Sequence, residues 1–503
     1  MKRREFLLTG AAICISGPAL AQMKMMNHDM PGMGTMPNGQ MMPQADIGAA
    51  SLPEGAPLRD LPRLVNTATE PGRFEAELNA APATARFAEG LDTPVLAYNG
   101  QTPGPLIEAA EGDHITITLA NRIPDEESTI HWHGMPVPAD QDGNPMDPVA
   151  AGADRVYTFD VPEGSAASYW YHPHPHGKTA EQVYRGLAGV FLVKPKIDPI
   201  PPAYGDTVLF FTDLRLAADG TMPPNNMVDL MNGRVGDYVL VNGQKNPILS
   251  VIAGTKRRFR LFNATNARFL RLSFGETTPM TIIGTDGGLL EAPIADVGDI
   301  LLAPAERLEV IVAFDKPGTT TLGTLDYDRG WMGPGRPNEA GLSLLRVQAV
   351  EGSTEPPPPL PARLRSIPDL GTPSVKRRFV FGEAMSMGAN GMEMAFMING
   401  ASFDMKRVDF VSKVGQVELW EVQNPADMDH PFHVHGTQFQ VIERERGGNV
   451  SKPLYKAWRD TVNVARGETV RVALRQDMPG PRMYHCHILE HEQLGMMGQY
   501  VAS

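Results

Sequence analysis

The amino-acid sequence predicts an all-β fold of three similar β-sandwich domains, because one pattern recurs three times and alternating strands lie inside each copy. Each copy begins at an Asn-Gly pair, continues to a glycine and reaches an asparagine nine residues further on. Apolar residues alternate with polar ones between that glycine and that asparagine, which indicates strands with one buried face. The copies begin 143 and 157 residues apart, and repeats of this length are typical of whole domains. The three copies are Asn99-Gly100, Gly112 and Asn121; Asn242-Gly243, Gly254 and Asn263; and Asn399-Gly400, Gly415 and Asn424.

The start of the chain predicts export. Lys2, Arg3 and Arg4 precede an apolar stretch that ends at Ala19-Leu20-Ala21, which is the organisation of a cleaved signal peptide over residues 1–21. The arginine pair is typical of a twin-arginine signal, whose machinery exports folded proteins, and a general secretory signal is the alternative. The apolar run is shorter than a bilayer span, so we expect no membrane span. These features predict a periplasmic protein.

Residues 22–55 are predicted to form a disordered tail, since their glycine-, proline- and methionine-rich composition fits no packed core. The remaining chain is divided by two proline-rich linkers, Pro199–Pro202 and Pro356–Pro361. We expect the first domain over 56–198, the second over 199–355 and the third over 356–503. Further alternating strands are expected at 156–161, 308–314 and 469–474.

Composition narrows the classes of function. The formal charge of −13 over 503 residues disfavours binding to nucleic acid or to anionic membranes. One of the two cysteines, Cys14, lies in the predicted signal peptide, so Cys486 is the single cysteine of the mature chain. It can form no intramolecular disulfide, and a free thiol in an oxidising compartment is a liability unless it is buried or coordinated.

Eleven of the 13 histidines fall in four short windows that cover 21 residues. Chance would place about half a histidine there. Such clusters are typical of metal ligands, and imidazoles around a single thiolate with a methionine nearby indicate copper. The windows read His131-Trp132-His133-Gly134; His172-Pro173-His174 with His176; His430-Pro431-Phe432-His433-Val434-His435; and His485-Cys486-His487 with His491.

The alternation of side chains along a strand separates these ligands into two sites. His485 and His487 point to one face of a strand and Cys486 to the other. By the same argument, His433 and His435 share one face and His430 takes the opposite one. We therefore expect His430 to join Cys486 in one metal site.

The residues after Cys486 complete that site. His491 and Met496 follow it at equal spacings of five residues, and two imidazoles, a thiolate and an axial methionine make a blue-copper site. Met497 is the alternative axial ligand, in which case Met496 is a core residue. Eight imidazoles remain, too many for one metal ion and suited to a three-copper cluster, namely those of His131, His133, His172, His174, His433, His435, His485 and His487.

These motifs give the chain a resemblance to multicopper oxidases of the laccase and copper-efflux oxidase family, over about residues 60–503. HxHG stands at 131–134, HxH at 172–174, HPxHxH at 430–435 and HCHxxxHxxxxM at 485–496. The resemblance implies cupredoxin-like Greek-key sandwiches and four copper ions, one of type 1, one of type 2 and two of type 3. It also implies a substrate oxidised one electron at a time and O2 reduced to water.

The family implies a role for each ligand. The implied type 1 ligands are His430, Cys486, His491 and Met496, the type 2 ligands are His131 and His433, and the type 3 ligands are His133, His172, His174, His435, His485 and His487. Asp142 and Glu492 match acidic residues that relay protons in the family. The alternative for these two is a solvated turn aspartate and a surface glutamate.

The reductant is predicted less directly. Residues 172–189 resemble bacterial periplasmic copper-efflux oxidases, and five methionines lie between residues 385 and 397, namely Met385, Met387, Met392, Met394 and Met397. Thioethers prefer Cu(I), although such a stripe also suits a core or a lid. Asp427, Met428 and Asp429 are a second candidate for receiving a cuprous ion. We expect a monomeric oxidase of Cu(I), with phenols as side substrates, that serves copper tolerance.

Three alternatives remain. The first is a general laccase that oxidises diphenols. The second is a non-enzymatic cupredoxin scaffold or copper-sequestering protein, which intact ligands disfavour. The third is a two-domain copper nitrite reductase, which the three repeats and the second histidine beside Cys486 disfavour.

Overall fold

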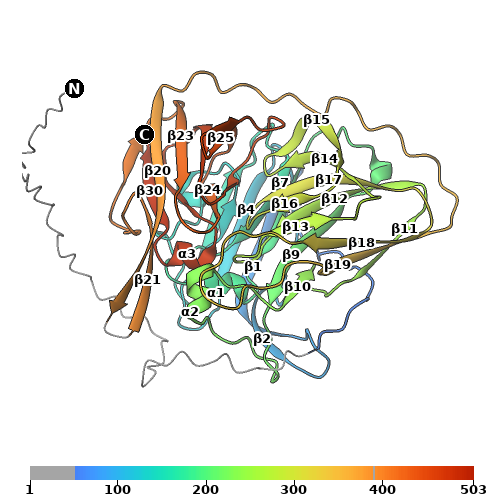
Figure 1. Ribbon diagram of the computed structural model, residues 1–503, viewed down its shortest axis with the longest axis horizontal. Coiled ribbons are helices and arrows are strands. Elements are labelled where there is room, and N and C mark those ends of the chain that lie inside the picture. The colour runs from blue at the N-terminus through green and yellow to red at the C-terminus, as the bar shows by residue number, and fades with distance from the viewer. Residues whose placement is uncertain (1–50, 389–390) are drawn as a thin grey trace, which may run out of the picture.

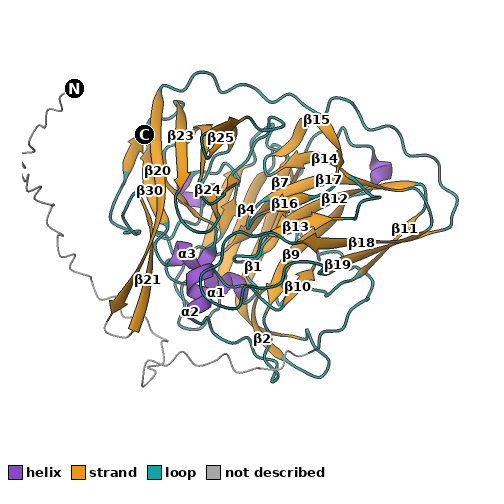
Figure 2. Ribbon diagram, in the orientation of Figure 1, coloured by secondary structure: helices purple, strands orange, loops and turns teal. Residues whose placement is uncertain are grey.

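Six β-sheets, packed in pairs as three sandwiches, make up the computed structural model, which describes residues 51–388 and 391–503 (Figure 1). We call them sandwich 1 (β1–β8), sandwich 2 (β9–β19) and sandwich 3 (β20–β30). Strands dominate and the few helices are short (Figure 2). The predicted all-β fold is therefore confirmed. The predicted signal peptide and the predicted tail up to residue 50 lie outside the described residues, and the expected domain boundaries stay predictions.

Sandwich 1 contains two four-stranded sheets with a shared apolar core. Leu78 and Ile117 from one sheet and Ile107 and Phe191 from the other are fully buried in that core. One sheet has the order β2(Thr93–Tyr98), β1(Arg73–Ala85), β4(His114–Asn121), β6(Asp154–Asp160), and the other has the order β3(Ile107–Ala110), β8(Gly189–Lys194), β7(Ala167–His172), β5(His131–His133).

Sandwich 2 is larger than sandwich 1 and forms the right-hand part of the molecule in Figure 1. Its sequence, residues 199–355, contains no histidine and no cysteine. One sheet has the order β10(Tyr238–Val241), β9(Thr207–Leu214), β12(Thr255–Asn263), β17(Arg307–Phe314), β14(Met280–Thr285), β15(Gly288–Val297), and the other has the order β11(Ile248–Ile252), β19(Ser343–Val350), β18(Gly318–Leu325), β13(Leu270–Ser273), β16(Ile300–Leu302).

Sandwich 3 repeats the same plan. One sheet has the order β21(Gly391–Ile398), β20(Val375–Gly388), β23(Val417–Asn424), β28(Glu468–Arg475), β25(Phe439–Arg446), β26(Asn449–Ser451), and the other has the order β22(Phe410–Ser412), β30(Met497–Ala502), β29(Gly480–Cys486), β24(His430–Val434), β27(Thr461–Val464). The strands expected at 156–161, 308–314 and 469–474 are found as β6, β17 and β28.

The sequence repeat corresponds to a structural repeat. Asn99, Asn242 and Asn399 all adopt positive φ, at 53°, 52° and 56°. Their side-chain oxygens accept from the backbone N–H groups of Asn79, Phe210 and Val380 in the neighbouring strand. Their side-chain amides donate to the carbonyls two residues earlier in that strand, those of Glu77, Val208 and Arg378. A following glycine with positive φ completes the turn. The turn therefore holds the strand that precedes it against its antiparallel neighbour, β2 against β1, β10 against β9 and β21 against β20.

Three short helices, α1(Thr179–Tyr184), α2(Met227–Asn232) and α3(Leu489–Gln493), come from three different sandwiches or their connections. They lie side by side near the centre of the molecule (Figure 2). Outside the regular strands, Leu52 is buried and Glu54 forms a backbone bridge with Lys245, so the chain around residue 54 lies against sandwich 2.

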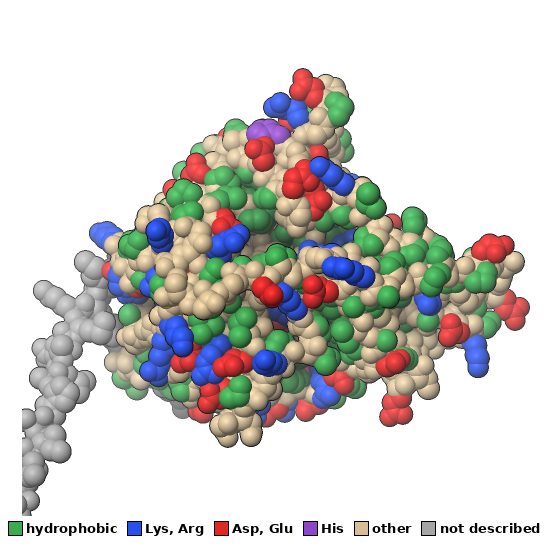
Figure 3. All heavy atoms as spheres, turned by 90° about the horizontal axis from the view of Figure 1, so that it is seen from above, with side chains coloured by type: hydrophobic (Ala, Val, Ile, Leu, Met, Phe, Trp, Pro, Cys, Tyr) green, Lys and Arg blue, Asp and Glu red, His purple; other side chains and the backbone are tan. Residues whose placement is uncertain are grey.

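Acidic and basic side chains are interspersed over the face drawn in Figure 3, which is hollowed near its centre. No helix among residues 51–388 and 391–503 is both long and apolar enough to cross a membrane.

The second asparagine of each repeat is expected to stabilise the fold. Asn263 donates to the carbonyls of Arg268 and Leu302, and its oxygen accepts from Thr265, all in a buried setting. Asn263→Ala leaves these groups without partners and is expected to cost about 2 kcal/mol. Thermal unfolding of the copper-free protein measures this as a lowered midpoint. Asn338→Ala, at an exposed loop residue, is the control, and an equal shift in both variants would contradict the structural role of the repeat.

Candidate metal centre

Cys486, the last residue of β29, lies in a buried group with His430 and His491. Its Sγ is 3.5 Å from His430 Nδ1, which is 3.3 Å from His491 Nδ1, and none of the three side chains is exposed. Burial raises the pKa of the Cys486 thiol well above its ordinary value. A thiol in this setting becomes a thiolate only when a cation takes the place of its proton.

Met496 lies on the same side of the sheet as Cys486. Met497 pairs with His485 in the antiparallel register of β29 and β30, so these two side chains share a face. Met496 precedes Met497, is fully buried and belongs to the apolar cluster that contains Cys486. Strand geometry therefore favours Met496 over Met497 as the fourth member of this group.

His491 is held from both sides. Its Nε2 donates to the carbonyl of Met231 at 3.1 Å, and its ring stacks on Phe396 of β21 with centroids 3.8 Å apart. These contacts direct Nδ1 toward His430 and Cys486. Neither partner is apparent from sequence motifs, because a backbone carbonyl carries no sequence signal and Phe396 lies 95 residues from His491.

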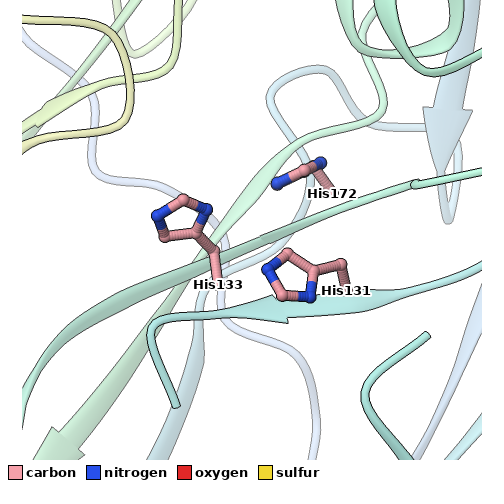
Figure 4. Close-up of side chains that lie close together, drawn as sticks. All are labelled: His131, His133 and His172. Carbon is pink, nitrogen blue, oxygen red and sulfur yellow. The ribbon is translucent and has the colours of Figure 1, made fainter. Parts of the chain in front are cut away.

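The remaining eight motif histidines form a second buried cluster between sandwich 1 and sandwich 3. The rings of His131, His133 and His172 approach one another in Figure 4. Across the boundary, His131 Nε2 is 3.4 Å from His433 Nε2, and within sandwich 3 His485 Nε2 is 3.0 Å from His435 Nε2. His174 Nε2 is 3.3 Å from His485 Nε2. His487 lies beside His133 and His172, with ring centroids 4.9 and 5.4 Å away.

Backbone carbonyls fix several of these rings through the nitrogen that faces away from the cluster. The Nδ1 atoms of His131, His433, His172 and His485 donate to the carbonyls of Asp142, Asp460, Pro173 and Cys486 at 2.8–3.0 Å. This arrangement selects one tautomer and leaves Nε2 as a lone-pair donor, as is usual for histidines that bind metals.

The donor set fits copper ions. Pairs of imidazole nitrogens face each other at 3.0–3.4 Å, and among the described residues His133 Nδ1, His172 Nε2 and both nitrogens of His487 have no hydrogen-bond partner. Burial lowers the pKa of His430 and His485 to about 3, so these rings are neutral at physiological pH. Neutral imidazoles with a single thiolate are ligands that copper prefers.

Cys486 links the two groups of side chains. It belongs to the group with His430 and His491, whereas His485 and His487, its neighbours in the sequence, belong to the histidine cluster. His485 faces His435 and His174, whereas Cys486 faces His430. The structure thus places these side chains on opposite faces, as strand alternation predicts.

Asp142 and Glu492 both contact the histidine cluster, from different sides. Asp142 is fully buried, with its carboxylate oxygens 3.2 Å from His131 Nδ1 and 3.3 Å from His435 Nδ1. Glu492 lies 3.2 Å from His485 Nδ1 and 3.5 Å from His174 Nε2. Burial raises the pKa of Glu492 well above its usual range. Neither residue is the solvated surface group that the alternative reading of the sequence describes.

Three further residues at the cluster have no sequence signature. Asp460 Oδ1 is 3.0 Å from His133 Nε2, and Thr461 Oγ1 is 3.2 Å from the same nitrogen. Arg307 of sandwich 2 donates to both carboxylate oxygens of Asp460. The histidine-free sandwich therefore reaches the cluster through the Arg307 side chain, which no ligand motif could reveal.

The methionines of 385–397 lie on the hairpin formed by β20 and β21. Met385 pairs with Met394 and Met387 with Met392 in its register. His114 lies away from the cluster, with Nδ1 2.6 Å from Asp160 Oδ1 at the surface. His176 packs on the ring of Phe403, with ring centroids 5.4 Å apart.

Comparison with known sequences gives one family. Models described as multicopper oxidase match residues 79–198, 212–321 and 381–503. The multicopper oxidase mco of Staphylococcus aureus is 32% identical over 429 residues, which cover 84% of this chain and 87% of that protein. The cell division protein FtsP of Photorhabdus laumondii is 33% identical over 424 residues, covering 81% of this chain and 85% of that protein.

Among solved structures, a multicopper oxidase from Campylobacter jejuni, described as a metallo-oxidase, superimposes with a TM-score of 0.85. It is 40% identical, and the match covers 91% of this chain and 98% of that one. This likeness confirms the predicted arrangement of cupredoxin-like sandwiches.

Replacing the thiol tests the group around Cys486. After loading with copper, Cys486→Ser is expected to lose the intense visible absorption of a copper thiolate, because serine supplies no sulfur ligand. Far-UV circular dichroism should stay unchanged, since the two side chains are nearly equal in size. Visible absorption that persists in the variant would show that the thiolate is not a copper ligand.

Proposed function

The chain belongs to the multicopper oxidase family, and we propose that it oxidises Cu(I) at the Cys486 site and reduces O2 to water at the histidine cluster. The observation that carries this proposal is the pair of neighbours Cys486 and His485. Cys486 Sγ lies beside His430, and His485 Nε2 lies beside His435 and His174. An electron that enters at Cys486 therefore has a path of a few covalent bonds to the cluster.

Four copper ions in these two sites supply one-electron oxidation at the first and four-electron reduction of O2 at the second. In this proposal the first site is held by His430, Cys486, His491 and Met496, and the second by His131, His133, His172, His174, His433, His435, His485 and His487. Within the second, His131 and His433 would hold the single type 2 ion, as the family resemblance implies, and their Nε2 atoms lie 3.4 Å apart.

Reduction of O2 to two waters consumes four protons, and the cluster is buried. Asp142 and Glu492 lie within 3.5 Å of cluster histidines on different sides. We assign both to proton delivery, since a carboxyl group at hydrogen-bond distance can carry a proton across such a barrier.

The methionine hairpin supports Cu(I) as the reductant. Met385, Met387 and Met394 share one face of the hairpin, because Met385 and Met387 are two residues apart on one strand and Met385 pairs with Met394 across it. Phe396 follows Met394 on that same face, and its ring stacks on His491. Met387 is 82% exposed and Met394 is partly buried. A line of thioethers, which prefer Cu(I), thus runs from solvent to a candidate copper ligand.

The second candidate for cuprous binding is less favourable. Met428 is fully buried, and the carboxylate of Asp429 already accepts from Tyr327, Asn463 and the backbone of Arg466. Only Asp427 is exposed. The hairpin is therefore the site that we assign to the substrate ion.

The similarity to a Campylobacter protein described as a metallo-oxidase favours a metal ion over an organic reductant. Together with the export signal predicted over residues 1–21, it supports a periplasmic enzyme of copper tolerance, exported as a folded monomer by the twin-arginine machinery. Phenols are proposed as side substrates, and a general laccase is the competing assignment.

A non-catalytic role is the second candidate function, because four relatives are described as cell division protein FtsP. Every motif ligand is nevertheless present and buried in this chain. Failure to bind copper, with no uptake of O2 in the presence of either reductant, is the result that would favour this candidate.

Steady-state kinetics on Cu(I) and on a diphenol separate the two oxidase assignments. We expect O2 uptake with Cu(I) to have the larger kcat/KM. Diphenol oxidation that is fast without added copper, together with negligible Cu(I) oxidation, would assign the protein as a laccase instead. Excess Cu(II) is the added control, because ions bound at the hairpin can also affect diphenol oxidation.

The hairpin face gives a sharper prediction. Met385→Leu with Met394→Leu keeps the apolar volume but removes one cross-strand pair of thioethers. KM for Cu(I) is expected to rise several-fold while diphenol kinetics stay within twofold. Met405→Leu, at a methionine that is 40% exposed and outside the hairpin, is the control. Equal effects on both substrates would refute a role in Cu(I) binding.

A further inference from the structure

We propose that Arg307 is a positioning residue of the histidine cluster, through which sandwich 2 sets the geometry of His133 and His433 by way of Asp460. This inference rests on the proposed copper cluster, and it adds to that cluster a residue from the part of the chain that supplies no ligand.

Arg307 opens β17 and is almost fully buried, with 1% exposure. Its guanidinium makes a bidentate ion pair with Asp460, with Nη1 2.6 Å from Oδ1 and Nη2 2.5 Å from Oδ2. Its Nε donates to the carbonyl of Ser168 in sandwich 1 at 2.8 Å. The carbonyls of Ala305 and Asp286 in sandwich 2 accept from Nη1 and Nη2. One side chain therefore joins all three sandwiches with every donor nitrogen engaged.

Asp460 passes this constraint to two cluster histidines. Its Oδ1 is 3.0 Å from His133 Nε2, and its backbone carbonyl accepts from His433 Nδ1 at 2.8 Å. Thr461 Oγ1 donates to the same Oδ1 at 3.0 Å, so this oxygen is fixed from several directions. His133 then keeps Nδ1 and His433 keeps Nε2 for a metal ion. A carboxylate on the outer nitrogen orients a ligating imidazole and raises its basicity.

Gly134, the glycine of the HxHG motif, lies against the Arg307–Asp460 ion pair. Gly134 has φ of +82°, and a Cβ at this position would overlap Asp460 Oδ2 and lie 2.8 Å from Arg307 Nη2. The chain that carries His133 therefore passes directly over the Arg307–Asp460 pair. Any larger residue at 134 would have to displace that pair, so the close approach requires glycine.

A purely structural ion pair would stabilise the interface without affecting the cluster. Sandwich 2 contains such a pair, which makes a matched comparison possible. Arg258 of β12 is buried, with 4% exposure, and its guanidinium binds Glu309 and Asp198. Glu309 accepts from Ser168 of sandwich 1, so this pair also bridges two sandwiches. No hydrogen bond or ion pair among the described residues links Arg258 to a cluster histidine.

The experiment compares Arg307→Lys with Arg258→Lys in the copper-loaded full-length protein. Lysine keeps the charge but loses the two-pronged geometry. We expect Arg307→Lys to change the hyperfine splitting of the type 2 copper in electron paramagnetic resonance and to lower kcat for O2 reduction at least tenfold. Its visible absorption from the Cys486 site should equal that of the wild type. Arg258→Lys should leave the resonance spectrum unchanged and kcat within twofold, even if its thermal midpoint falls equally.

Asp460→Asn is a second test of the same inference. It keeps the shape of the side chain and removes the negative charge with which Arg307 pairs. It is expected to reproduce the altered type 2 spectrum, so the inference stays testable if Arg307→Lys does not fold. A type 2 spectrum identical to wild type in a folded Arg307→Lys or Asp460→Asn protein would overturn the inference. A change of equal size in Arg258→Lys would also overturn it. A wild-type protein that binds no copper would instead overturn the proposed function itself.

Discussion

The alternation of side chains along β29 is the constraint on which the rest of the site depends. His485 and Cys486 are joined by one peptide bond, yet their side chains contact different groups of buried donors. The opposed faces separate the two groups in space while keeping them a few bonds apart. The same alternation on β24 sends His430 and His433 to different groups. Any slip of register between these strands would exchange the two faces and destroy both groups at once.

Much of this arrangement could be predicted from the sequence, because it depends on local rules. The motif spacings and the two-residue period of strands place His430 with Cys486 and His433 with the other histidines. The Asn-Gly repeats similarly correspond to turns that recur in each sandwich. Such features need only nearest neighbours along the chain, so a single sequence contains the information that specifies them.

The contacts that orient the ligands could not be predicted in this way. Asp460 and Arg307 are 153 residues apart and come from different sandwiches, and the carbonyl of Met231 reaches His491 from 260 residues away. An arginine in a strand and a backbone carbonyl in a short helix carry no distinguishing pattern. Their significance comes only from tertiary packing, which brings the histidine-free sandwich to the edge of the cluster. The candidate metal ligands can thus be recognised in the sequence, whereas the groups that hold them in place cannot.

The histidine cluster combines β5 and β7, near the start of the chain, with β24 and β29, near its end. The cluster can therefore form only after nearly the whole chain has been synthesised. His131 and His485 are separated by 354 residues. A chain growing on the ribosome completes sandwich 1 long before the strands that close the cluster have been synthesised. Until then, half of the imidazoles face an open surface. Stable capture of metal is therefore a late event in biogenesis, and any copper that binds earlier meets an incomplete and more exchangeable set of donors.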